Sequence, residues 1–127
     1  MAERILQYHL PDKTISSAGI GALEGKGIDE NAQDLLRQSG YTADNHCARQ
    51  VSVKMLNDAD LVLVMEKRHQ AALMSRYPSS SGKVMLLGSW LDQEIHDPYC
   101  KSYEVFKHVF ERVERCCFSW VPMLNDQ

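Results

Sequence analysis

The stretch LVLVM at residues 61–65 decides the fold class of this sequence. An uninterrupted aliphatic run of this length is typical of a strand that is buried on both faces of a parallel sheet. The run VMLLG at 84–88 has the same character, and residues 67–77 between the two runs have a helical pattern that ends before Pro78. Two strands joined by a helix pair in parallel through a right-handed crossover, so this unit predicts an α/β fold.

Further elements are predicted on either side of this strand–helix–strand unit. They are a helix over 2–9, a strand over 13–19 that leads into a glycine-rich loop, a helix from Asp29 to Gly40, a turn near 54–57 and a helix over 103–120. Asp29 is a suitable N-cap and Gly40 a suitable stop for the helix between them. The whole pattern predicts a single α/β domain over residues 1–127, with a small parallel sheet flanked by helices in three layers.

The topology also predicts where a site should lie. Ligands of parallel α/β folds bind beyond the carboxyl ends of the strands. We therefore expect the loops after Ser17, Met65 and Gly88 to form the site, and the turn at 97–99 to reach the same end of the sheet.

Composition is that of an ordinary globular protein. Of the 127 residues, 44% are hydrophobic and 24% are charged, and the formal net charge is −3. This charge gives no basic surface, so we expect no nucleic-acid partner. No apolar run approaches the ~20 residues that cross a bilayer, and residues 1–6 carry charges where a signal peptide has its apolar core. We expect a cytoplasmic protein without membrane insertion.

The cysteines form neither a disulfide framework nor a metal motif. Cys47, Cys100, Cys116 and Cys117 are irregularly spaced and contain no Cys-x-x-Cys pair, the spacing that many zinc and redox sites use. The adjacent Cys116 and Cys117 fall in the last predicted helix, where neighbouring side chains diverge by about 100°. We expect them to fill helix packing, and we expect neither a metal nor another cofactor.

Five motifs resemble, in the same order, those of the low-molecular-weight protein tyrosine phosphatases. They are ISSAGIGAL at 15–23, HCARQ at 46–50, DLVLVM at 60–65, LLGSWL at 86–91 and DPY at 97–99. Residues 17–23 and 88–92 look most like the bacterial members that partner tyrosine kinases in polysaccharide export. The resemblance implies a hydrolase that dephosphorylates a phosphotyrosine protein, with an autophosphorylating bacterial tyrosine kinase of exopolysaccharide or capsule assembly as its partner.

In this family, the aspartate that matches Asp97 is the general acid. Tyrosine leaves its phosphate ester as a phenolate, whose conjugate acid has a pKa of about 10. A carboxylic acid that protonates the bridging oxygen removes this charge as the bond breaks, and the resulting carboxylate can then activate water against the phosphoenzyme. The simpler alternative is an Asp-Pro turn without a chemical role.

The resemblance implies four further site residues. Tyr99 and Leu23 match residues that form opposite walls around the substrate ring; many eukaryotic members carry tryptophan where this sequence has Leu23. Ser17 and His46 match residues that brace an asparagine of the phosphate loop, and such bracing maintains the geometry of an oxyanion site. The structural alternatives are core packing for Tyr99 and an ordinary loop histidine for His46.

The nucleophile loop of the family, Cys-x5-Arg, does not occur in these 127 residues. The residues six positions after the four cysteines are Val53, Phe106, Pro122 and Met123. The resemblance places the loop immediately before Met1, after a strand that lies in the sheet between those matching 13–18 and 60–65. We therefore expect an N-terminally incomplete domain without its first central strand, and no phosphatase activity from these residues alone.

Three other functions stay open. A non-catalytic member would bind phosphotyrosine or a protein partner through Leu23 and Tyr99. An arsenate-reductase-like enzyme shares the fold, but Cys47, Cys100 and Cys116 do not have the spacing of a cysteine relay. A nucleotide-binding module would need a G-x-G-x-x-G or Walker sequence, which the glycines at 19 and 21 do not complete.

Overall fold

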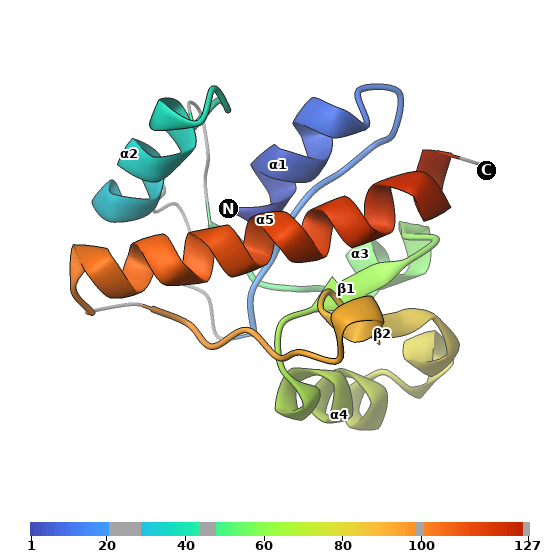
Figure 1. Cartoon of the computed structure of the whole chain (residues 1–127). Coiled ribbons are helices and arrows are strands. Elements are labelled where there is room, and N and C mark those ends of the chain that lie inside the picture. Colours follow the sequence, from blue (N-terminus) through green and yellow to red (C-terminus); the bar gives the residue numbers. More distant parts are fainter. Residues whose placement is uncertain (21–28, 44–47, 99–100, 126–127) are drawn as a thin grey trace.

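The computed structural model describes residues 1–20, 29–43, 48–98 and 101–125. In the view of Figure 1 the long helix α5 crosses the molecule, with α1 and α2 above it and the strands and α4 below it. The elements are α1 (Ala2–His9), α2 (Glu30–Gln38), α3 (Val53–Asp58), β1 (Val62–Val64), α4 (Lys67–Arg76), the 3-10 helix η1 (Pro78–Lys83), β2 (Val84–Leu86), the 3-10 helix η2 (Ser89–Leu91) and α5 (Tyr103–Asn125).

The sheet is parallel and is built around the run that decides the fold class. β1 pairs with β2, with Val62 opposite Val84 and Val64 opposite Leu86, and α4 forms the connection between them. The predicted parallel sheet flanked by helices is therefore confirmed, although both strands are shorter than the apolar runs that contain them.

The strand that the sequence predicts over 13–19 is not present, so this prediction is wrong. A single β-bridge at Gly19 is the one strand-like contact of the segment among the described residues. Gly19 forms an isolated parallel bridge with Gln50; its N–H donates to the carbonyl of Arg49 and its carbonyl accepts from the N–H of Val51, both at 2.9 Å. A strand needs a neighbouring strand along its length to satisfy its backbone groups. In the described residues, the segment has such a neighbour only at Gly19.

β1 separates two hydrophobic clusters. The larger cluster contacts one face of the strand through Leu61, Leu63 and Met65. The smaller cluster lies on the other face and contains Val64 together with residues of α3, α4 and β2. Because successive side chains of a strand point to opposite faces, both faces are covered, as the uninterrupted apolar run predicts.

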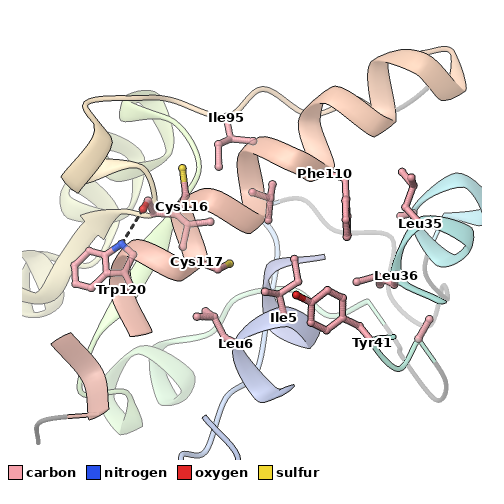
Figure 2. Packing of buried hydrophobic residues seen from close by; sticks show 14 of the residues in the cluster. Ile5, Leu6, Leu35, Leu36, Tyr41, Ile95, Phe110, Cys116, Cys117 and Trp120 are labelled. Atoms are coloured by element: carbon pink, nitrogen blue, oxygen red, sulfur yellow. Dashed lines mark hydrogen bonds between the residues drawn. The ribbon is translucent and has the colours of Figure 1, made fainter. Parts of the chain in front are cut away.

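The larger cluster joins three helices that are far apart in the sequence. Figure 2 shows Ile5 and Leu6 of α1, Leu35 and Leu36 of α2 and Phe110 of α5 packed toward one another. At the end of α5, the indole Nε1 of Trp120 donates to the carbonyl of Leu87 at 2.7 Å. This buried bond attaches α5 to the residue that follows β2.

Two predicted helix ends are confirmed, and a third is not. The carboxylate of Asp29 accepts from the N–H of Asn31 at 2.9 Å, and Gly40 has a φ of +85° at the other end of α2. α5 continues to Asn125, beyond the predicted end at residue 120 and through Pro122. A proline removes one backbone bond, and so near the end of a 23-residue helix it does not stop the helix. None of the described helices combines the length and hydropathy that crossing a membrane requires.

Candidate active site

The described part of the chain contains two of the five predicted site residues. Ser17 is half-buried in the segment between α1 and the Gly19 bridge, and Asp97 is exposed between η2 and α5. Leu23, His46 and Tyr99 lie outside the described residues, and their roles stay predictions.

The chain just before Asp97 is held at the carboxyl end of β1. Ile95 is 3% exposed, and its N–H donates to the carbonyl of Met65 at 2.9 Å. The carboxylate of Glu94 accepts from the N–H of Lys67 at 2.7 Å. Met65 and Lys67 stand at the junction between β1 and α4, so Asp97 lies near the end of the sheet where parallel α/β folds bind their ligands.

A buried carboxylate occupies the same junction. Glu66 is 7% exposed. Its Oε1 accepts from Arg68 Nε at 3.2 Å and from His96 Nδ1 at 3.0 Å, and its Oε2 accepts from Arg68 Nη2 at 3.1 Å. These hydrogen bonds, first that of Arg68 and then that of His96, lower the pKa of Glu66 against the opposing effect of burial. Glu66 is therefore an anion at neutral pH.

Arg68 links this buried carboxylate electrostatically to Asp97. The pKa of the Arg68 guanidinium is raised, mainly by its hydrogen bond and charge interaction with Glu66, and further by the charge of Asp97. The side chain of Arg68 is 74% exposed. Asp97 thus lies within electrostatic range of an exposed guanidinium whose positive charge is already paired with Glu66.

The bridge at Gly19 joins two of the other motifs. Ser17 stands two residues before Gly19, which pairs with Gln50, and residues 49–51 follow His46 in the sequence. The stretch that carries Ser17 is therefore next to residues 49–51, which lead into α3. Two motifs that are about thirty residues apart in the sequence meet here.

Two of the cysteines are packed in the interior. Cys116 and Cys117 of α5 are fully buried. Burial raises the pKa of both thiols, that of Cys117 to about 12, whereas a nucleophilic cysteine needs a lowered pKa. Their predicted packing role is confirmed; Cys47 and Cys100 lie outside the described residues. Across residues 1–20, 29–43, 48–98 and 101–125, no group of three His, Cys, Asp or Glu side chains could hold a metal ion.

Sequence reasoning missed the residues that form the hydrogen-bonded group at the junction of β1 and α4. Glu66, Arg68 and His96 were assigned no role, although Glu66 directly follows the apolar run at 61–65. An ionisable residue at this position was a usable signal, because the carboxyl end of a buried strand is where site residues are expected. The hydrogen bond between Glu66 and His96 could not be predicted from the sequence, because these residues are thirty positions apart.

Comparison with known proteins gives consistent matches over nearly the whole chain. Residues 1–127 match the family described as low molecular weight phosphotyrosine protein phosphatase. The low molecular weight protein-tyrosine-phosphatase Wzb of Salmonella typhimurium is 46% identical over 125 residues, which are 98% of this chain and 84% of the relative.

Solved structures agree with the fold. A structure described as that of a protein tyrosine phosphatase has a TM-score of 0.94 and 44% identity, over 98% of this chain and 85% of the other. Vibrio vulnificus Wzb in complex with benzylphosphonate has a TM-score of 0.93 and 37% identity, over 96% of this chain and 87% of the other.

Proposed function

Since this chain belongs to the low molecular weight phosphotyrosine protein phosphatase family, we propose that it serves the hydrolysis of tyrosine phosphate in proteins with Asp97 as the general acid. The observation that carries this proposal is the position of Asp97. The residue is exposed, belongs to the DPY motif at 97–99, and follows a segment tied to the end of β1 by the bond between Ile95 and Met65.

In the proposed reaction, Asp97 acts twice. Its protonated carboxyl donates to the tyrosyl oxygen as the bond to phosphorus breaks, and its carboxylate then removes a proton from the water that attacks the phosphoenzyme. Tyr99 and Leu23 form the walls around the phenyl ring. Ser17 and His46 brace the phosphate loop.

We further propose that these 127 residues alone do not turn over substrate. The family reaction needs a thiolate in a Cys-x5-Arg loop, and the sequence has no arginine six positions after any cysteine. The two described cysteines have raised pKa values. Removing the nucleophile of an enzyme costs on the order of 10⁶ in turnover, so the residues present supply the acid but not the attacking group.

The proposed substrate is a phosphotyrosine protein, namely an autophosphorylating bacterial tyrosine kinase of exopolysaccharide or capsule assembly in the cytoplasm. Support comes from the motifs at 17–23 and 88–92 and from the bacterial relatives that are named as tyrosine phosphatases. Incubating the protein with such a kinase and following its phosphotyrosine content tests the partner separately from the chemistry.

The activity test compares the 127-residue chain with a fusion protein in which a family strand and Cys-x5-Arg loop precede residue 2. We expect no hydrolysis of phenyl phosphate by the chain and clear hydrolysis by the fusion. In the fusion, Asp97→Asn should lower kcat by about 10²–10⁴-fold. The effect should be smaller with p-nitrophenyl phosphate, whose leaving group needs less help from an acid.

Asp92→Asn is the matched control for this test. Asp92 is an exposed aspartate of the same stretch with a φ of 52°, a conformation that asparagine tolerates well, so this variant should keep full activity. A folded fusion that is insensitive to Asp97→Asn contradicts the acid assignment. Asp97-dependent turnover by the 127-residue chain contradicts the proposed inactivity, and tight binding of a phosphotyrosine peptide by that chain would favour a binding module instead.

A further inference from the structure

Three consecutive residues before Asp97 are bonded to three consecutive residues at the junction of β1 and α4. Glu94 accepts from the N–H of Lys67, Ile95 donates to the carbonyl of Met65, and His96 contacts Glu66. The first two contacts use backbone groups of the junction. The contact between Glu66 and His96 joins two side chains, and it holds the residue directly before Asp97.

Residues 96 and 97 form a short exposed segment between two buried residues. Ile95 and Pro98 are buried, whereas His96 and Asp97 are exposed. The proline restricts the backbone of Asp97 to extended conformations, and the hydrogen bond of His96 constrains the other side. The hydrogen bond of His96 to Glu66 and the proline ring thus constrain the backbone on both sides of the Asp97 side chain.

Glu66 is suited to holding this ring because its carboxylate is not used as a helix cap. Glu66 stands at the N-cap of α4 without a side-chain bond to the helix backbone, and the side chain of Glu94 accepts from the N–H of Lys67 instead. Arg68 donates one hydrogen bond to each carboxylate oxygen of Glu66. One oxygen of Glu66 also faces His96, and the His69 ring lies 3.6 Å from the other oxygen.

The chemistry of the pair determines which ring nitrogen of His96 carries the proton. A carboxylate only accepts hydrogen bonds, so Nδ1 must be the donor in the neutral ring as well as in the charged ring. A free imidazole favours the proton on Nε2. The contact with Glu66 at 3.0 Å therefore selects the less common tautomer and fixes the orientation of the ring.

We propose that Glu66 is a positioning residue for Asp97, acting through a hydrogen bond that holds the Nδ1–H tautomer of His96. The consequence for catalysis rests on the proposed role of Asp97 as the general acid. An acid must be within hydrogen-bond reach of the leaving oxygen, and a displacement of about 1 Å at a catalytic group costs on the order of 10²-fold in rate.

The first test is spectroscopic and needs no activity. Nitrogen NMR of the His96 ring in the 127-residue chain, at a pH where the ring is neutral, should show the proton on Nδ1. Glu66→Met removes both acceptor oxygens at similar length and should shift the proton to Nε2, whereas Glu66→Gln keeps one acceptor and should retain the Nδ1–H form. A proton on Nε2 in the unchanged protein would overturn the proposal.

The second test shows whether the pair acts through Asp97. In the fusion protein, Glu66→Met and His96→Phe should each lower kcat by about 10–100-fold with little change in KM. His96→Asn should recover much of the loss, because its amide can donate from nearly the position of Nδ1. His96 is exposed, so its variants should fold even where a Glu66 variant does not. His108→Phe, on the exposed face of α5, is the control.

A double variant separates the two proposals. If Glu66 acts through Asp97, then Glu66→Met should have almost no further effect on kcat in an Asp97→Asn background. A full additional loss in that background would overturn the positioning role. A normal rate for Asp97→Asn together with a normal Nδ1–H tautomer would instead refute the acid assignment and leave the contact between Glu66 and His96 established.

Discussion

Glu66 shows how the partners of a single residue set its charge state. Its carboxylate is buried, yet two bonds from Arg68 and one from His96 keep its pKa low. Tyr41 shows the opposite case: burial first, and then its 2.7 Å hydrogen bond to the carboxylate of Glu114, raise the pKa of its phenol. In both cases a partner from a distant part of the chain, His96 for Glu66 and Glu114 for Tyr41, adds to a larger effect, which is the nearby Arg68 for Glu66 and burial for Tyr41.

The pKa of Glu66 predicts how stability changes with pH. Its folded value lies below the ordinary value of 4.5, so the carboxylate stabilises the fold above that pH, and this contribution is lost as the pH falls through the folded pKa. In urea unfolding, Glu66→Gln should lower the midpoint at neutral pH, and the difference from the unchanged protein should shrink under acidic conditions. Glu111→Gln, at an exposed position of α5, is the control for the substitution itself. A pH-independent difference for Glu66→Gln would contradict the assignment.

At the scale of the element, α2 shows how local chemistry ends a helix. Asp29 caps its first turn. At the other end the N–H of Tyr41 donates to the carbonyl of Leu36 at 2.9 Å, which requires Gly40 to adopt its φ of +85°. This conformation is strained for a residue with a Cβ, even though no atom lies within 4 Å of the position that a Cβ would occupy.

Two glycines provide a matched test of this strain. Gly40→Ala should lower the free energy of unfolding by about 1–2 kcal/mol, because alanine disfavours the left-handed region. Gly82 in η1 also has open space around it but does not have a positive φ, so Gly82→Ala should be neutral or stabilise by up to about 1 kcal/mol. Denaturant unfolding of both variants measures the difference. Equal effects would show that the positive φ of Gly40 does not cause the loss, since both sites have open space.

At the scale of the whole molecule, the sheet is small for the helices around it. Among the described residues β1 pairs only with β2, while its two faces contact clusters that involve α1, α2, α3, α4 and α5. Hydrophobic contacts thus hold the layers together more than the ladder does. From the resemblance to the phosphatase family, we expect a further strand along the edge of β1 that faces away from β2.

Adding that strand should stabilise the molecule. In the fusion protein with its cysteine nucleophile replaced by serine, each new backbone bond should add about 1 kcal/mol, and each kcal/mol raises Tm by roughly 2–8 °C. A second fusion with a proline at the centre of the added strand cannot complete the ladder and should lose most of the gain. Thermal unfolding compares both fusions with the 127-residue chain; three equal Tm values would contradict strand pairing at this edge.

Much of the fold could be predicted because its signals are local. Apolar runs at 61–65 and 84–88, the caps of α2 and the helical pattern of 103–120 are properties of neighbouring residues, and the structure confirms the elements that they predict. The strand expected at 13–19 could not be judged in this way, because a strand exists only where another strand lies beside it. The turn at 97–99 could be named as part of a site, but the hydrogen bonds that join Glu66 to Arg68 and His96 could not be predicted.

By itself, the sequence determined the order and type of most elements, the parallel sheet and the family to which the chain is similar. Tertiary structure alone decided that Glu66 meets His96, that Tyr41 meets Glu114 and that Trp120 meets the carbonyl of Leu87. The physical reason is the separation along the sequence between the residues that interact. A helix or an apolar strand depends on residues within a few positions of one another, whereas a hydrogen bond between residues thirty or more positions apart requires that every element between them is already in place.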